Sequence, residues 1–202
     1  MNETAMVYIV DDEPKVLRAI GRLVRSAGYS AATFSSPKEF LSRHDPLVTG
    51  CLVVDIAMPE MNGLDLQAEL AAKGSALPII FLTGRGDISM SVKAIKRGAV
   101  DFLTKPVDDS RLIDTIQQAI KKCLAVQASR AEIDQLNRRL ATLTARELQV
   151  LRLIVKGDTN KEIAAALGTV EKTIKVHRGR VMEKMGVDSL AQLVRLAIRA
   201  KI

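Results

Sequence analysis

The sequence predicts an α/β domain with a doubly wound, five-stranded parallel sheet, followed by an all-α domain of four helices. The first prediction rests on short apolar runs that alternate with amphipathic helical patterns through the first half of the chain. The second rests on the sequence after Leu143, where only helical periodicity remains. The charge distribution separates the same two halves.

The predicted strands are short and nearly all apolar, which is typical of strands covered by helices on both faces. They are Met6–Val10, Ala31–Phe34, Cys51–Val54, Ile79–Leu82 and Val100–Leu103. Helical patterns lie between and after them, at Pro14–Ala27, Pro37–Arg43, Gly63–Ala72, Ile88–Arg97 and from Asp109 onward. In sheets of this kind the working site lies just past the carboxyl ends of the strands.

A long uninterrupted segment joins the two halves, because no Gly or Pro occurs between Arg111 and Leu140. Four apolar residues near its end follow a 3-4-3 spacing: Ile133, Leu136, Leu140 and Leu143. This spacing suits a short coiled-coil seam or a single amphipathic helix packed on its own domain, and the sequence leaves both open. We therefore expect a first domain at 1–122, a helical linker at 123–141 and a second domain at 142–202.

The second domain begins with a recognisable helix start. Thr144 is followed three residues later by Glu147, a spacing that predicts a capping box. Leu148, Leu151 and Val155 form the predicted inner stripe of this helix. The other three helices are predicted at Asn160–Leu167, Val170–Met185 and Ser189–Lys201.

The net charge of +7 lies entirely in the second half. Residues 1–122 carry 15 Lys and Arg and 15 Asp and Glu, whereas residues 123–202 carry 15 basic and 8 acidic residues. A neutral first half and a basic second half indicate two tasks, with polyanion binding in the second. An aromatic content of 3% and the absence of tryptophan argue against a single-strand binder that works by base stacking.

Composition also excludes several classes of protein. No apolar run approaches the roughly 20 residues of a membrane span, and the N-terminus lacks the basic segment of a signal peptide. We therefore expect a cytoplasmic protein with no membrane partner. Cys51 and Cys123 have no metal-ligand spacing and are expected to be small buried residues. His44 and His177 fall in different halves, which disfavours hydrolase chemistry based on a histidine within one domain.

Polar residues follow four of the five predicted strands. Asp11 and Asp12 follow the first, Asp55 the third, Thr83 the fourth and Lys105 the fifth. These strand ends meet at one edge of a doubly wound sheet, so the three carboxylates should converge, and their repulsion requires a cation. Hard oxygen donors suit Mg²⁺, and a carboxylate beside that ion is a competent phosphoryl acceptor. Each residue alone could be a helix cap or part of a turn, so the inference rests on the set.

This set resembles the receiver domain of response regulators, which has a CheY-like or flavodoxin-like fold. The resemblance covers about residues 5–122 and is carried by Asp11-Asp12, Asp55 with Met58-Pro59 and Gly63, Thr83-Gly84, and Lys105-Pro106. It implies that Asp55 is the phosphoacceptor. It also implies a Mg²⁺ site formed by Asp11, Asp12, Asp55 and the backbone carbonyl of Ala57.

The same resemblance assigns roles around the phosphoryl group. It implies that Thr83 and Lys105 bind that group and that Phe102 is a switch aromatic, although an ordinary buried Phe would give the same pattern. Ala57 and Arg85 occupy nearby positions that vary in the family. Ala57 cannot orient an attacking water, so we predict slow self-dephosphorylation and no enzymatic activity beyond the receiver's own phosphoryl transfer.

The predicted helix Val170–Met185 has an apolar face and a cationic face. Ile174, Val181 and Met185 recur at helical spacing and should face the core. The opposite strip contains Lys172, Val176 and Gly179, flanked by Lys175 and Arg180. Its small central side chains would allow close entry into a DNA major groove, although a merely solubilising face would show the same pattern.

Three segments resemble the LuxR-type helix-turn-helix: Leu143–Glu147, Asn160–Ala164 and Thr173–His177. The resemblance covers roughly 142–202, and with the receiver it indicates the FixJ/NarL family. It implies a positioning helix at Asn160–Leu167 and a recognition helix at Val170–Met185. The DNA-binding residues that it implies are Asn160, Lys161, Lys172, Thr173, Lys175, Val176, His177 and Arg178. Gly179 stands where some relatives carry a long base-reading side chain, so specificity should depend more on Lys175 and on DNA shape.

The combined resemblance implies a phosphorylation-controlled transcriptional regulator. A cognate sensor histidine kinase would phosphorylate Asp55, and the receiver would form a homodimer through a face that includes Val92, Ile95 and Lys96. Two recognition helices would then bind double-stranded promoter DNA, with RNA polymerase as a further candidate partner.

Three alternatives stand beside this hypothesis. An aspartyl phosphatase of the haloacid-dehalogenase kind also uses a carboxylate and Mg²⁺, but it places D-x-D on its first strand, whereas Asp11 and Asp12 are adjacent. A phosphorylation-independent regulator would use the receiver only to dimerise, and the full acid set argues against it. An RNA-binding antiterminator is disfavoured by the LuxR-type pattern.

Overall fold

The structure is a computed structural model that describes all 202 residues except 1–4, 46–47, 85–91, 93 and 201. The chain divides into two compact units, Met1–Gln127 and Ala128–Ile202. The expected boundaries near residues 122 and 141 stay a prediction. Within the described ranges, no helix has the length and apolar character needed to cross a membrane.

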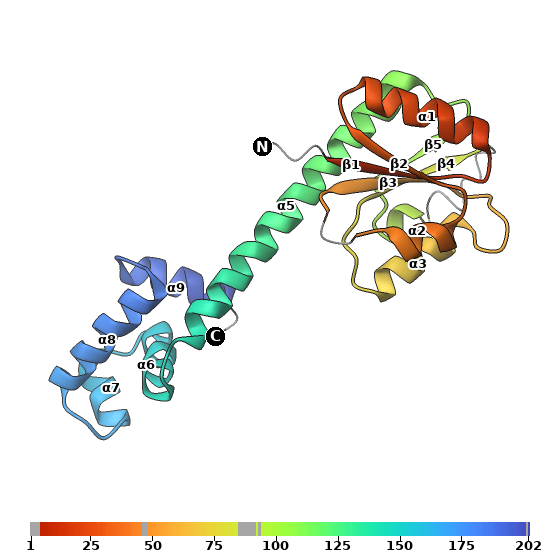
Figure 1. The fold of residues 1–202 in the computed structure, drawn as a ribbon. Helices are drawn as coiled ribbons and strands as arrows, with labels where there is room; N and C mark the ends of the chain where they lie inside the picture. Colours follow the sequence, from red (N-terminus) through yellow and green to blue (C-terminus); the bar gives the residue numbers. More distant parts are fainter. Residues whose placement is uncertain (1–4, 46–47, 85–91, 93, 201) are drawn as a thin grey trace. The chain divides into compact units, whose positions relative to one another are not determined.

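The first unit is built on a five-stranded sheet in which every neighbouring pair is parallel (Figure 1). The strands are β1 (Met6–Val10), β2 (Ser30–Phe34), β3 (Gly50–Asp55), β4 (Ile79–Thr83) and β5 (Asp101–Thr104). Their order is β2-β1-β3-β4-β5, so the direction of winding reverses between β1 and β3. This topology confirms the predicted fold class and makes the carboxyl ends of those two strands the topological switch point, where sheets of this kind bind ligands.

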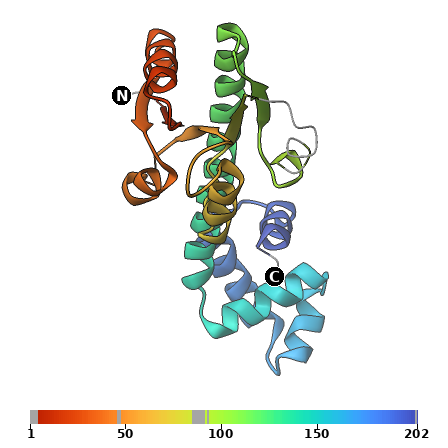
Figure 2. The same ribbon diagram turned by 90° about the vertical axis from the view of Figure 1, so that its right-hand side faces the viewer.

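Helices cover both faces of this sheet, as Figures 1 and 2 show. Helix α1 (Pro14–Ser26) and the start of α5 (Asp109–Ala141) pack on one face, and α2 (Pro37–Arg43) and α3 (Gly63–Ala72) pack on the other. Side chains alternate between the two faces along each strand, so both faces of the sheet are apolar. In β1, Val7 and Ile9 belong to the core formed with α1 and α5, whereas Tyr8 and Val10 belong to the core formed with α2 and α3. Half of the helix expected at Ile88–Arg97 lies outside the described residues, and in the other half Val92 and residues 94–96 are helical.

The second unit contains four helices after the end of α5, as predicted. They are α6 (Ala145–Lys156), α7 (Asn160–Ala166), α8 (Glu171–Met185) and α9 (Leu190–Arg199). The predicted capping box is present, because Thr144 Oγ1 accepts from the amide of Glu147 and the Glu147 carboxylate accepts from the amide of Thr144. A second capping box at Thr159 and Glu162 begins α7.

The predicted inner stripe of α6 faces the core of the second unit. Leu151 is fully buried, and Leu148 and Val155 pack against the same core but are only partly buried. Val150 and Ile154, which were not predicted, are buried beside them. Glu147, which is 2% exposed, lies on the same face in the first turn of the helix. Residues three, four and seven positions after an inward-facing residue share its face.

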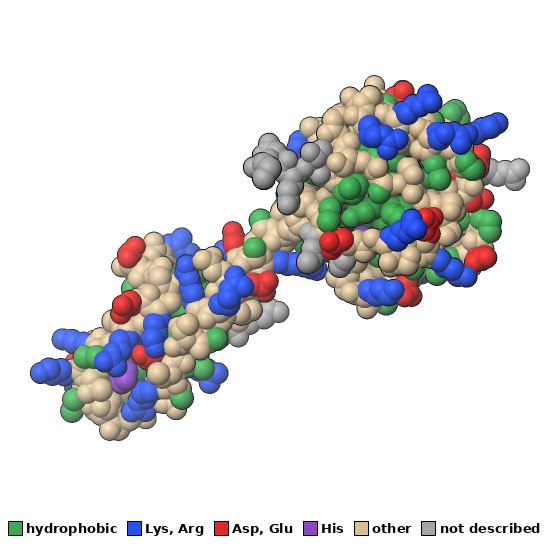
Figure 3. Space-filling view, in the orientation of Figure 1, with side chains coloured by type: hydrophobic (Ala, Val, Ile, Leu, Met, Phe, Trp, Pro, Cys, Tyr) green, Lys and Arg blue, Asp and Glu red, His purple; other side chains and the backbone are tan. Residues whose placement is uncertain are grey.

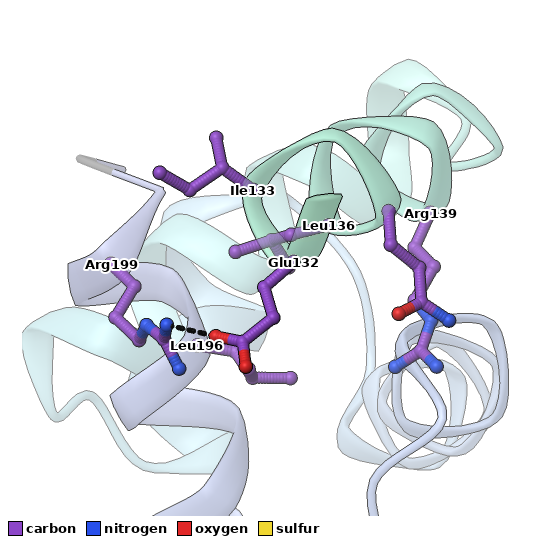
Figure 4. Close-up of a pocket in the computed structure, with 7 residues that line it drawn as sticks. Glu132, Ile133, Leu136, Arg139, Leu196 and Arg199 are labelled. Carbon is purple, nitrogen blue, oxygen red and sulfur yellow. Dashed lines mark hydrogen bonds and ion pairs between the residues drawn. The ribbon is translucent and has the colours of Figure 1, made fainter. Parts of the chain in front are cut away.

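The end of α5 packs on the second unit. Leu136 is 6% exposed within the core formed with α6 to α9, and Leu140 and Leu143 pack against the same core. Figure 4 shows Leu136 beside Leu196 of α9, with an ion pair between Glu132 and Arg199 next to them. Of the two readings of the 3-4-3 spacing, the structure therefore supports an amphipathic helix packed on its own domain. Ile133 lies away from that core and remains 42% exposed.

Candidate functional sites

The three predicted carboxylates lie together at the carboxyl edge of the sheet. Asp11 and Asp12 follow β1, and Asp55 ends β3. Each can offer one oxygen atom such that all three oxygens lie within 4.8 Å of one another. Asp11 is fully buried, Asp55 is 4% exposed, and Asp12 is exposed. One member of the cluster thus faces solvent while two are held inside.

Lys105 brings a positive charge to this cluster from the end of β5. Its Nζ lies 2.7 Å from Asp11 Oδ2 and 3.1 Å from Asp55 Oδ2. The amide of Lys105 donates to the carbonyl of Thr83 at 2.7 Å, which fixes the lysine backbone beside the end of β4. The bond between Lys105 and Pro106 is cis, an isomer that the sequence alone did not decide.

Burial and charge act in opposite directions at this edge. Burial raises the pKa of Asp11 above its ordinary value, and the hydrogen bonds from Lys105 and the Glu13 amide only partly offset that effect. Burial alone would lower the pKa of Lys105, but the hydrogen bonds and negative charges of Asp11 and Asp55 outweigh it, so that pKa is raised. One ammonium group therefore stays charged among several carboxylates.

The cluster suits a divalent ion on chemical grounds. Asp55 Oδ1 is buried and has no hydrogen-bond partner among the described residues, although buried carboxylate oxygens are normally satisfied. The available donors are hard oxygens, which Mg²⁺ prefers, and exposed Asp12 leaves a side open to water. Ala57 lies two residues after Asp55 and is exposed, so its backbone carbonyl comes from the same edge.

The other predicted phosphoryl-binding residues lie on the neighbouring strands. Thr83 ends β4 one position after Leu82, which pairs in register with Asp55, and it is 4% exposed. Phe102 of β5 is half-buried, and its ring centroid lies 6.4 Å from that of Phe81. Arg85 lies outside the described residues.

Two residues contribute to this edge in ways that the sequence did not reveal. The Glu13 carboxylate lies 3.8 Å from Lys105 Nζ, and the backbone amide of Glu13 donates to Asp11 Oδ1 at 2.9 Å. The run of three acidic residues was the available signal, but only the first two were assigned. A Cβ on Gly63 would lie 2.5 Å from the carbonyl oxygen of Asp55, so glycine is required for α3 to begin against the end of β3.

Helix α8 has the two faces predicted from its sequence. Ile174, Val181 and Met185 are fully buried. The residues of the opposite strip are all exposed: Lys172, Lys175, Val176, Gly179 and Arg180. Figure 3 shows Lys and Arg side chains gathered on the surface of this unit. A cationic strip on a helix that is anchored by its other face can follow the groove of a polyanionic duplex.

The remaining predicted DNA contacts differ in accessibility. Lys161 of α7 is exposed, whereas Asn160, Thr173, His177 and Arg178 are partly buried. Asn160 Oδ1 and His177 Nδ1 are buried without a hydrogen-bond partner among the described residues. Buried polar atoms of this kind are expected to find a partner, which a bound molecule could supply.

A partly buried ion pair supports the start of α6 and was not predicted. Lys184 Nζ, on the last turn of α8, lies 2.6 Å from Glu147 Oε2 and donates to the carbonyl of Thr142 at 3.0 Å. The hydrogen bond from Lys184, together with those from Thr144, lowers the pKa of Glu147 to about 2. The pair ties α8 to the first turn of α6.

Comparison with known families assigns each half of the chain. The family described as the response regulator receiver domain matches residues 7–117. The family described as bacterial regulatory proteins of the luxR family matches residues 141–197. Together the two matches span most of both units.

Full-length relatives share this arrangement. The response regulator protein TmoT of Ectopseudomonas mendocina is 44% identical over 200 residues, covering 99% of this chain and 91% of the relative. The transcriptional regulatory protein FixJ of Bradyrhizobium diazoefficiens is 38% identical over 200 residues, covering 99% and 98%. Among solved structures, the response regulator StyR matches with a TM-score of 0.88 at 42% identity, covering 97% of this chain and 99% of StyR.

Proposed function

The chain belongs to the response regulators that join a receiver domain to a LuxR-type DNA-binding domain, and we propose that phosphorylation of Asp55 controls its binding to promoter DNA. The observation that carries the proposal is the environment of Asp55. This carboxylate has one oxygen 3.1 Å from Lys105 Nζ and the other buried without a partner among the described residues.

We assign the roles of the acidic edge as follows. Asp11, Asp12, Asp55 and the backbone carbonyl of Ala57 would hold Mg²⁺, which when bound supplies charge compensation for the transferring oxygens. Thr83 would donate a hydrogen bond to the phosphoryl group, and Lys105 would pair with its negative charge. This division agrees with the geometry, because Lys105 is the cation that contacts Asp55 among the described ion pairs.

The phosphoryl transfer that we propose is balanced at Asp55. A carboxylate oxygen of Asp55 attacks the phosphorus of a phosphohistidine on a sensor kinase, the P–N bond breaks, and the histidine nitrogen leaves with the bonding electron pair. Lys105 keeps its proton throughout, since its raised pKa makes it a charge partner rather than an acid. We further propose that this transfer and a slow loss of the phosphoryl group are the only reactions that the chain catalyses.

The second unit would bind double-stranded promoter DNA through α7 and α8. Lys175, Val176 and Lys172, which are exposed on α8, would reach base edges in the major groove. Phosphate contacts would come from Lys161, Thr173, His177 and Arg178. Asn160, at the start of α7, would also contact the DNA. The basic excess of the second half supports this assignment, because phosphate neutralisation supplies most of the non-specific affinity for DNA.

Coupling between the two activities would depend on the receiver surface. We propose that Thr83 moves toward the phosphoryl group, that Phe102 fills the vacated space, and that a homodimer forms through a face including Val92 and Ile95, each 46% exposed, and Lys96. Dimerisation would bring two recognition helices to neighbouring half-sites, where RNA polymerase is a further candidate partner. The domains would span 1–122 and 142–202, with the linker 123–141, in a cytoplasmic protein.

One experiment tests the proposal directly. Wild type, Asp55→Asn and Asp114→Asn are incubated with Mg²⁺ and acetyl phosphate, and labelling is read by mass spectrometry. Binding is then measured to duplexes that the wild type selects from a random-sequence library. Asp114 is an exposed carboxylate of α5 outside the acidic edge, so its variant controls for the loss of one charge.

The expected result separates the three proteins. Wild type and Asp114→Asn become labelled and bind DNA more tightly, whereas Asp55→Asn remains unlabelled and keeps only basal binding. A shift of a few kcal/mol between two receiver states is enough to reverse their populations. Equal stimulation of Asp55→Asn and wild type would refute the proposal.

A further inference from the structure

Gly179 lies in the middle of the exposed face of α8. Lys175 and Val176 precede it by four and three residues, so they are its neighbours on the helix surface. Val176 is 49% exposed, and Lys175 and Arg180 on either side of the strip are exposed as well. The centre of a cationic strip is therefore bare backbone.

No contact among the described residues accounts for glycine at this position. A Cβ built on Gly179 would meet no described atom within 4 Å, and its φ is not positive. Gly157, Gly168 and Gly186 each have positive φ, and a Cβ on Gly63 would lie 2.5 Å from a backbone oxygen, so those glycines have local causes.

Glycine in the interior of an exposed helix is also unfavourable for folding. It ranks below every residue except proline in helix propensity, because its backbone loses the most freedom when it becomes helical. Alanine at position 179 should therefore stabilise α8, and no contact opposes it. Glycine at position 179 lowers the stability of α8, and no contact within the described residues requires it. This points to a requirement set by a binding partner.

We propose that Gly179 is a specificity-determining position at which the backbone of α8 comes into direct contact with base edges in the major groove of duplex DNA. The inference rests on the proposed DNA-binding function and deepens it. Lys175, one turn earlier, can reach past this flat segment to a base edge, while apolar Val176 can contact a thymine methyl group. A side chain at position 179 would hold the helix away from the bases, and these shorter contacts would be lost.

The test compares Gly179→Ala and Gly179→Leu with wild type in the full-length chain. Dissociation constants are measured on a duplex that the wild type selects from a random-sequence library, and on an unselected duplex of the same length. Hydrogen exchange of the α8 amides reports local stability. Gly21→Ala is the control for replacing a helical glycine away from α8. Gly21 is buried in α1, where a Cβ would lie 3.0 Å from the end of the Arg25 side chain and 3.4 Å from the Thr33 methyl group.

Alanine at position 179 should slow exchange of the α8 amides by about fivefold and weaken binding to the selected duplex by about tenfold. Binding to the unselected duplex should change less than twofold, since phosphate contacts do not require close entry. Leucine should weaken specific binding further, and Gly21→Ala should leave both duplex affinities unchanged.

Two results would overturn the inference. Wild-type affinity of Gly179→Ala for the selected duplex would show that the position has no contact with bases. Faster exchange of the α8 amides together with weaker binding to both duplexes would show that Gly179 serves folding instead. Failure of the wild type to enrich any duplex would instead refute the proposed function on which the inference depends.

Discussion

Lys105 and Asp55 form an ion pair at the carboxyl edge of the sheet, with Lys105 Nζ 3.1 Å from Asp55 Oδ2 and the two side chains 17% and 6% exposed. The same nitrogen also contacts Asp11, which is fully buried. One cation thus compensates two buried carboxylates that the fold forces together. The arrangement favours binding of a divalent cation beside Lys105.

Asp11→Asn should raise the stability of the first unit while weakening metal binding. Burial raises the pKa of Asp11, so its charged form is disfavoured in the folded state. That carboxyl adds stability when protonated and loses the contribution as pH rises through its folded pKa. In the presence of a chelator at neutral pH, the variant should therefore have the higher unfolding midpoint, and the difference should shrink as pH falls through that pKa.

Metal affinity of the same variant is measured with Mn²⁺ by electron paramagnetic resonance, since the chain has no tryptophan to report binding by fluorescence. We expect a loss of about tenfold or more, because Asp11 is one of the carboxylates proposed to hold the ion, partly through water. Asp114→Asn should alter neither property. An Asp11→Asn variant that is less stable than wild type at neutral pH would contradict the burial argument.

Phosphorylated wild type should lose its phosphoryl group slowly, with a half-life of minutes or longer. The exposed side chain of Ala57, two residues after Asp55, has no polar atom that could orient a water molecule. Ala57→Asn supplies such an atom and should speed dephosphorylation by roughly tenfold or more. The decay is followed by mass spectrometry after removal of the phosphodonor.

Ala76→Asn is the matched control for this experiment, because Ala76 is exposed in the loop before β4, at the opposite edge of the sheet. Phosphorylated Ala76→Asn should lose its phosphoryl group at the wild-type rate. A wild-type half-life of only a few seconds would show that another group already orients the water.

Glu147→Gln should reduce the acid sensitivity of the second unit. The hydrogen bond from Lys184 holds the pKa of Glu147 at about 2, below its unfolded value of 4.5. A lowered pKa adds stability above the unfolded value and loses it as pH falls from about 4.5 to about 2. At neutral pH the variant should lose about 2 kcal/mol of unfolding free energy, because Lys184 is left without its carboxylate.

The measurement is denaturant unfolding of this unit between pH 7 and pH 2. The difference between Glu147→Gln and wild type should narrow over the lower part of that range. Glu183→Gln, which changes an exposed carboxylate of α8, should follow the wild-type curve throughout. A constant difference across the range would mean that Glu147 acts through packing alone.

Lys175→Ala and Lys161→Ala should weaken DNA binding in different ways. Lys175 is exposed on the α8 strip, so its loss should cost about 1–3 kcal/mol on the selected duplex and relax preference at one base position. Lys161 lies on α7, and Lys161→Ala should weaken binding equally on all sequences. It should also reduce the slope of log affinity against log salt concentration by about one. Titrations at several salt concentrations separate the two effects.

Arg152→Ala removes the same charge from an exposed position on α6 and serves as the control. It should leave base preference unchanged. Identical losses for Lys175→Ala on selected and unselected duplexes would contradict a role in base contact.

The sequence allowed the sheet to be predicted within one residue at each strand end. Buried parallel strands appear as apolar runs, and β3 illustrates the small error, since it begins at Gly50 and ends at Asp55 rather than spanning Cys51–Val54. Ladder hydrogen bonds are made by the backbone, so a strand can include polar residues that periodicity assigns to a loop. The edge residue Asp55 was correctly expected beside Asp11 because topology, rather than side-chain detail, brings them together.

Side-chain orientation was harder to predict. Glu147 was assigned only to a capping box, yet it is buried and paired with Lys184, which lies 37 residues away in the sequence. The approach of the Glu13 carboxylate to Lys105 is likewise a contact between distant segments. Such contacts depend on how helices pack, and the periodicity of a single helix carries no information about its partner.

Helix α5 contributes side chains to two separate cores, with Leu112 and Ile116 in the first unit and Leu136 in the second. The choice of fragment boundaries must therefore keep each part of α5 with the core that it packs in. A fragment that starts at residue 142 would lack Leu136 and Leu140 and would leave α9 without Glu132, the partner of Arg199. Fragments for studying the isolated DNA-binding half should instead begin near residue 128, so that the last turns of the helix stay with the core they help to fill.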